Sequence, residues 1–385
     1  MAMGCGRAGA GALRALARGP VRSLRQGRIA ARSIIAPGGT MIGCRSRQVA
    51  VPEDPMHGLQ TSDSSAQLAA ELGAWCAVFI NLARRGDRRS RLARRFAAAN
   101  SVLLSRLARL DAVDGQRLSL DDDIMLSRFI SRDALEQAHR AKQMGGFTIV
   151  HQEGQLLRFH NHLTEGGIAC AMSHYAALEA VASHPTADWG LILEDDISGV
   201  LPNVHHVIAR ILRKLPHDWD AVFLGYHGGV LAGSTAGEDT TEEDTRARME
   251  LQIDELRGAT DGFVGSVDGN ILAAPGEYDP PVIRMFLPLY GLYSWMVRKE
   301  AAQAMLLGAF PVDGQVDHAL SRWVIQRGKT FRVAPQHCLF ASLRSEDGLD
   351  SDIQTMAPFE ELMANPELCE RYMNFLRSES QLTGE

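Results

Sequence analysis

The chain has 385 residues, of which 45% are hydrophobic and 22% charged, and its formal net charge is −6 at pH 7. This length suits one large globular α/β domain with appendages, or two modest domains. No run of about 18 or more apolar residues occurs, so no transmembrane segment is predicted. The six cysteines are scattered and form no C-x-x-C pair, which indicates neither a zinc ribbon nor a dithiol redox motif.

The first 50 residues differ in charge from the rest of the chain. They contain nine arginines and no lysine, aspartate or glutamate, so the remainder carries a formal charge of about −15. An acidic remainder argues against nucleic-acid binding. An acid-free leader rich in arginine and alanine resembles a transit peptide, so we expect residues 1–50 to be a disordered targeting leader for a mitochondrion or plastid. The alternative is a basic tail on a protein of the cytoplasm or the endomembrane lumen.

Composition also predicts how the remaining chain is divided. Residues 51–73 have the prolines, glycine and serines of a polar linker. We expect the folded domain to span residues 74–345 and a C-terminal tail to span residues 346–385. An acidic stretch at about 234–262 interrupts the domain, and we interpret it as a solvated insertion, with an acceptor-binding loop as the alternative.

Within the domain, short apolar runs alternate with segments whose apolar residues recur at helical spacing. This alternation predicts a mostly parallel, doubly wound α/β sheet flanked by helices. The expected strands lie at about 77–80, 189–193, 220–224, 291–297 and 331–333. The expected helices lie at about 87–100, 164–182, 202–215, 299–307 and 316–326.

Three carboxylates, Glu194, Asp195 and Asp196, follow directly after a buried strand. They must lie at its carboxyl end, where open α/β sheets bind ligands. Strand alternation would place Glu194 and Asp196 on one face and Asp195 on the other. Adjacent carboxylates repel unless a cation compensates them, and oxygen ligands suit Mg²⁺ or Mn²⁺. The sequence therefore predicts a metal site here, and the alternative is an acidic turn that caps the next helix.

Other residues are candidates on spacing alone. Arg84 and Arg88 surround a predicted helix start, an arrangement that attracts phosphate, and the alternative is a solvated basic helix start. Cys170 and His174 share one helix face, and we expect packing or support of a neighbouring ligand rather than metal binding, because two ligands alone do not make a zinc site. Asp313 and Asp317 are either first-turn helix stabilisers or an acceptor base.

Four separated segments resemble glycosyltransferase family 25, which includes lipopolysaccharide-biosynthesis and collagen galactosyltransferases. They are V-F-I-N-L with R-R-G-D-R-R at 78–89, A-V-D-G at 112–115, L-T-E-G-G-I-A-C-A-M-S-H at 163–174, and L-I-L-E-D-D at 191–196. The resemblance implies a GT-A-like fold, a UDP-sugar donor (often UDP-galactose), Mn²⁺ (or Mg²⁺), and inversion by direct attack of an acceptor hydroxyl.

The resemblance also assigns roles to residues of this chain. It implies a metal site of Glu194, Asp195 and Asp196. It places beside the nucleotide or donor the residues Asn81, Arg84, Arg88, Asp114, Ser173 and His174. Two positions depart from the family pattern, because Gly167 stands where glutamate is usual and Ala169 where glycine is usual.

We therefore expect a hexosyltransferase that moves a hexose, galactose first among the candidates, to a hydroxyl of a glycan, a lipid-linked sugar or a protein. Asp317 or Asp313 is the expected catalytic base. The departure at Gly167 motivates one alternative, a non-catalytic nucleotide-sugar or glycan-binding protein of the same fold. A metal-dependent hydrolase of nucleotide-sugars is the other.

Overall fold

The computed structural model describes most of the predicted domain. The described residues are 47–48, 70–99, 101–144, 148–152, 155–159, 163–232, 278–342, 353, 356–358 and 364–383. Nearly all of the predicted leader and linker, and the whole acidic insertion at 234–262, lie outside these residues. Among the described residues, no helix is both long enough and apolar enough to cross a membrane.

In the described part of the chain, a sheet of eight strands forms the centre of the domain, and its strand order is β1-β3-β2-β6-β10-β8-β11-β9. The strands are β1 (Arg47–Gln48), β3 (Leu107–Asp111), β2 (Trp75–Asn81), β6 (Trp189–Glu194), β10 (Ser294–Arg298), β8 (Ala221–Gly225), β11 (Thr330–Val333) and β9 (Val282–Arg284). The edge strand β1 lies within the segment predicted as a leader.

Five of the eight described strands of this sheet run in one direction, as the prediction of a mostly parallel sheet requires. They are β3, β2, β6, β8 and β11. However, β10 lies between β6 and β8 and is antiparallel to both, and β9 and β1 are antiparallel edge strands. The sheet is therefore mixed, because strand direction depends on the path of the connecting chain, which the apolar pattern does not reveal.

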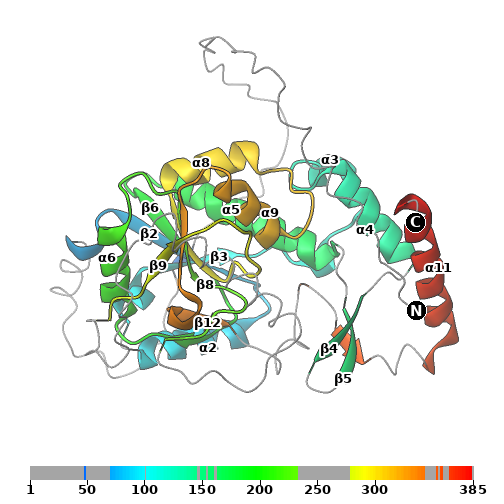
Figure 1. The fold of residues 1–385 in the computed structure, drawn as a ribbon, viewed down its shortest axis with the longest axis horizontal. Coiled ribbons are helices and arrows are strands. Elements are labelled where there is room, and N and C mark those ends of the chain that lie inside the picture. Colours follow the sequence, from blue (N-terminus) through cyan, green and yellow to red (C-terminus); the bar gives the residue numbers. More distant parts are fainter. Residues whose placement is uncertain are drawn as a thin grey trace, which may run out of the picture. The chain divides into compact units, whose positions relative to one another are not determined.

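Helices cover both faces of the sheet (Figure 1). The helices α5 (Glu165–Ser183), α8 (Lys299–Gly308) and α9 (Val316–Ile325) lie on one side. The helix α2 (Gly86–Ala98) lies on the other side. The start of α6 (Val204–Lys214) is joined to the end of α2 by a hydrogen bond from the amide of Asn203 to the carbonyl of Ala99. These five helices confirm the predicted alternation.

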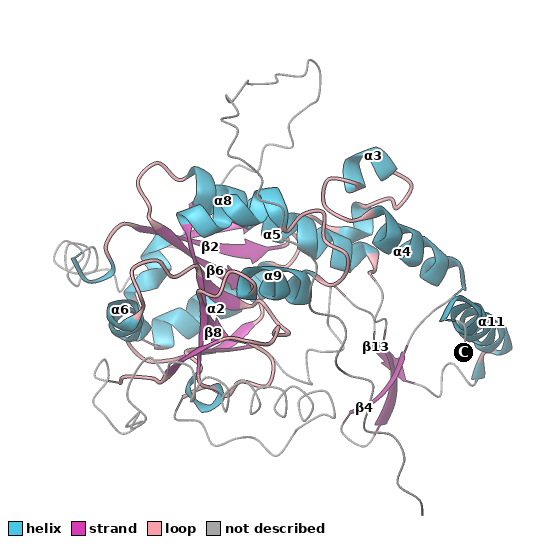
Figure 2. Cartoon of the chain, turned by 45° about the horizontal axis from the view of Figure 1, so that its top comes forward, coloured by secondary structure: helices cyan, strands magenta, loops and turns pink. Residues whose placement is uncertain are grey.

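A segment between β3 and α5 forms structure of its own and meets the C-terminal tail (Figure 2). It contains α3 (Asp123–Leu126), α4 (Arg132–Met144), β4 (Thr148–Gln152) and β5 (Gln155–Phe159). The tail strand β13 (Met356–Pro358) pairs with β5, and Arg371 of α11 (Pro366–Thr383) donates hydrogen bonds to two carbonyls at the end of α4. The tail is thus packed against this segment.

The remaining short elements lie around the ends of the strands. A two-stranded sheet pairs β7 (Ile197–Val200) with β12 (Phe340–Ser342), which brings residue 342 beside the chain that leaves β6. The described residues also form the 3-10 helices η1 (Val102–Arg106), η2 (Gly115–Arg117) and η3 (Pro335–His337).

Gly190 allows α5 to pack closely against β6. A Cβ added at Gly190 would lie inside contact distance of both methyl groups of Val181. We expect Gly190→Ala to destabilise the fold by about 1–3 kcal/mol, as overpacking of a filled core does. Urea unfolding measures this loss, and a second substitution, Val181→Ala, should recover part of it. Gly314→Ala is the matched control, since an added Cβ there meets no atom within 4 Å; equal losses at both glycines would contradict the expectation.

Candidate active site

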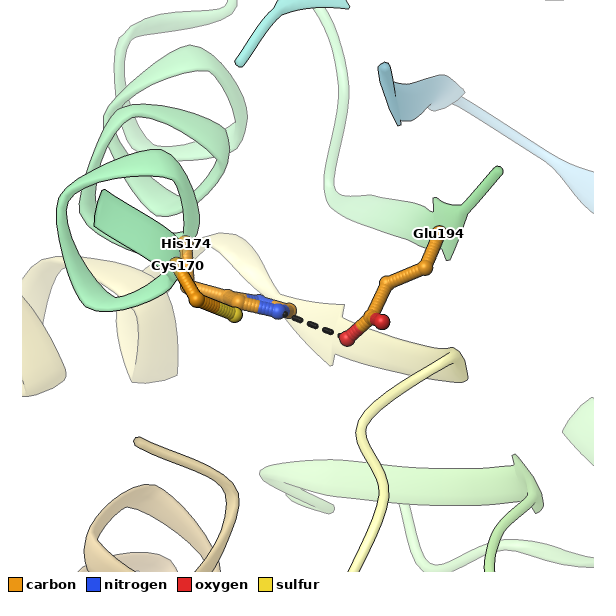
Figure 3. A group of neighbouring side chains, drawn as sticks. All are labelled: Cys170, His174 and Glu194. Carbon is orange, nitrogen blue, oxygen red and sulfur yellow. Dashed lines mark hydrogen bonds and ion pairs between the residues drawn. The ribbon is translucent and has the colours of Figure 1, made fainter. Parts of the chain in front are cut away.

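The three carboxylates after β6 contact three different parts of the chain. Glu194 is the last residue of β6, and the chain turns immediately afterwards. The alternation expected along a continued strand therefore ends at Glu194. Its Oε1 lies 3.0 Å from Nε2 of His174, a fully buried side chain on α5. Figure 3 shows these two side chains pointing toward one another. Glu194 itself keeps 21% of its side chain exposed, so it faces both α5 and solvent.

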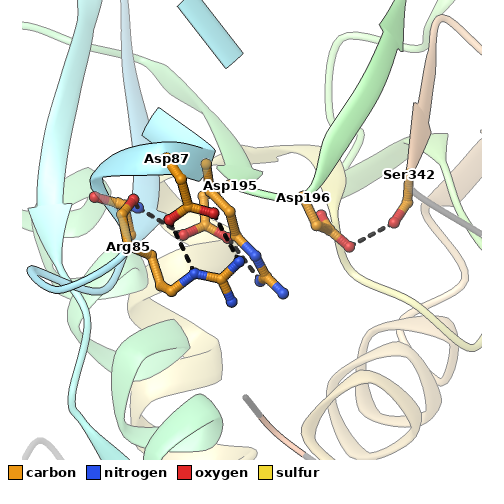
Figure 4. A network of polar contacts seen from close by, with 7 residues as sticks. Arg85, Asp87, Asp195, Asp196 and Ser342 are labelled. Carbon is orange, nitrogen blue, oxygen red and sulfur yellow. Dashed lines mark hydrogen bonds and ion pairs between the residues drawn. The ribbon is translucent and has the colours of Figure 1, made fainter. Parts of the chain in front are cut away.

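Asp195 is held by the first predicted motif. Its Oδ2 accepts a hydrogen bond of 2.6 Å from Nδ2 of Asn81, and its Oδ1 lies 3.2 Å from Nη1 of Arg88. Arg109 on β3 in turn donates to Oδ1 of Asn81. Burial raises the pKa of Asp195, against the opposing effects of Arg88 and Asn81. Both oxygens of Asp195 are therefore engaged with β2 and α2, and Figure 4 shows this carboxylate beside the start of α2.

Asp196 turns toward β12. Its Oδ2 accepts a hydrogen bond from Ser342, whereas its Oδ1 is buried and has no hydrogen-bond partner among the described residues (Figure 4). Burial, and then the charge of Glu194, raise the pKa of Asp196 to about 7. A buried carboxylate oxygen without a partner, next to a second carboxylate, is the environment that a divalent cation compensates.

Hydrogen bonds join the four motif segments to one another. Arg84 lies 3.2 Å from Oδ2 of Asp114, which links the first motif to A-V-D-G. The hydroxyl of Ser173 accepts from the amide of Val113, which links A-V-D-G to α5. The residue next to Ser173 on α5, His174, reaches Glu194. The residues predicted to lie beside the nucleotide-sugar donor are therefore linked around the end of β6, either directly or through residues adjacent to them in the chain.

Glycine is needed where two of these motifs touch. A Cβ on Gly115 would lie 2.8 Å from the backbone of Gly166, so only glycine permits this approach of the chain to the first turn of α5. Gly167, the departure from the family pattern, is buried beside the side chain of Gln315. A Cβ at Gly167 would lie 3.4 Å from Oε1 of Gln315, so Gln315 occupies the space next to this position.

The two candidate bases have different surroundings. Asp313 is exposed, and both of its oxygens accept hydrogen bonds from Arg322. Asp317 accepts from the amides of Gly291 and His318. The segment that begins at Gly291 reaches the end of β6, where the carbonyl of Tyr293 accepts from the amide of Glu194. Asp317, rather than Asp313, is thus connected to the carboxylate cluster.

Two residues that contribute to the site, Arg109 and Ser342, are not among those predicted from the sequence. Arg109 supports Asn81 from β3, and the signal was an arginine inside a short apolar run. Ser342 binds Asp196 from 146 residues away, and no local pattern marks it.

Replacing Arg88 with alanine is expected to destabilise the fold by about 3–5 kcal/mol, because the carboxylate of Asp195 would stay buried after losing its ion pair with Arg88. Urea unfolding at neutral pH measures this loss, and adding Asp195→Asn should recover much of it. Arg94→Ala, an exposed position on the same helix, is the control and should change stability by less than about 0.5 kcal/mol. A double variant as unstable as Arg88→Ala would contradict the assignment.

Comparison with known proteins supports a family for this region. Residues 77–220 match the model of glycosyltransferase family 25, described as an LPS biosynthesis protein. This confirms the resemblance over the part of the chain that holds the four motifs, and it supports a glycosyltransferase in general, with a sugar donor and an acceptor. The match ends before β10 and α9, so Asp313 and Asp317 lie outside it. No curated protein matches the chain.

Proposed function

From the family-25 match, we propose that the chain is a metal-dependent, inverting hexosyltransferase of GT-A-like fold that moves a hexose from a UDP-sugar to an acceptor hydroxyl. One observation carries the proposal: within the matched region, Asp196 lies beside Glu194 at the carboxyl end of β6 and has a buried carboxylate oxygen with no hydrogen-bond partner among the described residues. Open α/β sheets bind ligands at this end of their strands.

Glu194 and Asp196 would hold the divalent cation, Mn²⁺ or Mg²⁺. When bound there, the ion would neutralise charge on the departing diphosphate. Asp195 has a different part in the proposal, because Asn81 and Arg88 already engage both of its oxygens. It fixes the start of α2 relative to β6, so that the other two carboxylates are oriented as a pair.

The start of α2 is suited to the diphosphate of the donor. Arg84 lies just before this helix, and about a third of its side chain is exposed. Exposed backbone amides at a helix start, together with a guanidinium, favour phosphate oxygens. Asp114 orients Arg84, while Ser173 and His174 hold the neighbouring chain segments in place.

Asp317 is the proposed base for the acceptor hydroxyl. It is linked through the segment 291–293 to Glu194, and its charge is among those that raise the pKa of the Cys170 thiol beside Glu194. Each carboxylate oxygen of Asp317 accepts one hydrogen bond from a backbone amide and keeps a second lone pair. The carboxylate can therefore still accept a proton.

The test is release of UDP from a panel of UDP-sugars by the purified chain, with and without Mn²⁺ and with and without an acceptor-glycan panel. We expect release with one donor that requires the cation and increases when an acceptor is present. Release that no acceptor increases would favour the nucleotide-sugar hydrolase. Tight UDP binding by calorimetry without release would favour the non-catalytic binding protein.

A further inference from the structure

A second set of possible metal ligands lies next to the carboxylate pair and is chemically different from it. Cys170, His174 and Glu194 each offer one ligand atom, a sulfur, a nitrogen and an oxygen, and these atoms all lie within 4.8 Å of one another (Figure 3). Cys170 and His174 alone are two ligands on one helix face. The fold adds Glu194 from β6 as a third.

The spacing of these atoms suits a small tetrahedral ion. Zinc binds sulfur, nitrogen and oxygen at about 2.0–2.3 Å, which places the ligand atoms of a tetrahedral site about 3.5 Å apart. The 3.0 Å between His174 and Glu194 requires only a small separation to reach this value. Three protein ligands would leave a fourth position open for water. The group opens to solvent on the side of Glu194, which keeps 21% of its side chain exposed.

The charges around Cys170 favour a cation. The negative charges of Glu194 and Asp317 act on its thiol, and a bound cation would offset them. Bound to zinc, the sulfur would be a thiolate, and the thiol proton would pass to solvent. A thiolate also selects among ions, since soft sulfur ligands prefer zinc to manganese or magnesium.

We propose that Cys170, His174 and Glu194 form a reversible Zn²⁺ site, and that zinc bound there withdraws Glu194 from the cation site that it shares with Asp196. Zinc then inhibits transfer in competition with Mn²⁺; this second part rests on the proposed function. The site is exchangeable rather than structural. Nδ1 of His174 has no hydrogen-bond partner in the described part of the chain, so the imidazole lacks the outer contact that strengthens a permanent zinc ligand.

Cobalt titration of the full-length, metal-free chain tests the site without any assay of activity. We expect Co²⁺ to produce a thiolate-to-cobalt charge-transfer band in the near ultraviolet, which Zn²⁺ then abolishes. The band should be lost in Cys170→Ser and retained in Cys369→Ser, a control thiol on α11. No band in the unsubstituted chain, or a band that persists in Cys170→Ser, would overturn the proposal. Circular dichroism verifies folding, and Cys170→Ala provides a second variant.

Zinc affinity and inhibition give a second measurement. Competition with a chromophoric chelator should show an affinity loss above about 100-fold in Cys170→Ser, beyond the loss typical of outer-shell changes. At fixed Mn²⁺, the zinc concentration that halves UDP release should rise at least about 10-fold in the same variant. If no donor is turned over, the proposed function fails while the cobalt band still tests the site. If UDP is released but no band forms, only the zinc site fails.

Discussion

Asp196→Asn is expected to reduce Mn²⁺-dependent UDP release by about 10³-fold or more. The substitution removes the charge of one of the two proposed cation ligands, and a bound cation contributes several kcal/mol to stabilisation of a departing diphosphate, at about 1.4 kcal/mol per factor of ten. Steady-state kcat/KM over a Mn²⁺ titration measures the loss. Raising Mn²⁺ should recover little of it, because an amide is a weak substitute for a carboxylate.

The same substitution is expected to stabilise the metal-free fold, relative to the unsubstituted chain, as the pH rises from 5 to 8. The pKa of Asp196 is about 7 in the fold against 3.8 for an unperturbed aspartate, so the folded state binds the proton more tightly. The protonated carboxyl of Asp196 contributes fully to stability below about pH 4, and this contribution is lost as the pH rises through 7. The free energy of unfolding then falls by at most about 4 kcal/mol. With a chelator present, Asp196→Asn should therefore gain stability over the unsubstituted chain between pH 5 and pH 8.

Asp218→Asn provides the control for both measurements. Asp218 is an exposed carboxylate paired with Lys329, before the amino end of β8 and away from the cluster. We expect it to change neither UDP release nor the difference in unfolding free energy between pH 5 and pH 8. Full Mn²⁺-dependent activity in Asp196→Asn would remove this residue from the proposed cation site. If the unsubstituted chain instead becomes more stable than Asp196→Asn as the pH rises, the raised pKa of Asp196 and the buried environment that explains it would be contradicted.

Asp317→Asn is expected to lower the rate of transfer by about 10²–10⁴-fold, the usual contribution of a general base. Asp313→Asn, four residues earlier, is the matched control and should retain most of the activity, because Asp313 is exposed and paired with Arg322. Single-turnover transfer with saturating donor and acceptor separates this loss from weaker binding. Thermal unfolding verifies that the segment anchored by Asp317 at Gly291 remains folded.

The reverse pattern would assign the base to Asp313. Equal losses in both variants would indicate that the start of α9 matters for folding rather than for proton transfer. Retained activity in both would place the base elsewhere in the chain, outside the two candidates.

Much of the fold was predictable from local patterns. The helical spacing in α5 and α6 and the apolar runs of β2, β6 and β8 lie within a few residues of the observed elements, because periodicity and burial act over neighbouring residues. The position of Glu194, Asp195 and Asp196 at a strand end was predictable for the same reason, since a doubly buried strand cannot continue through three charges. The antiparallel direction of β10 was not, as the apolar run is the same in either direction.

The tertiary structure decided what each carboxylate does. Asp195 meets Asn81 across 114 residues, and Asp196 meets Ser342 across 146. Hydrogen bonds between such distant residues depend on strand order and on the turn after β6. Neither of these can be predicted from the spacing of apolar residues in the sequence. The same holds for Cys170 and His174, which share a helix face by local spacing but become a three-ligand group only where β6 brings Glu194 beside α5. Local chemistry selected the residues, and long-range packing determined their partners.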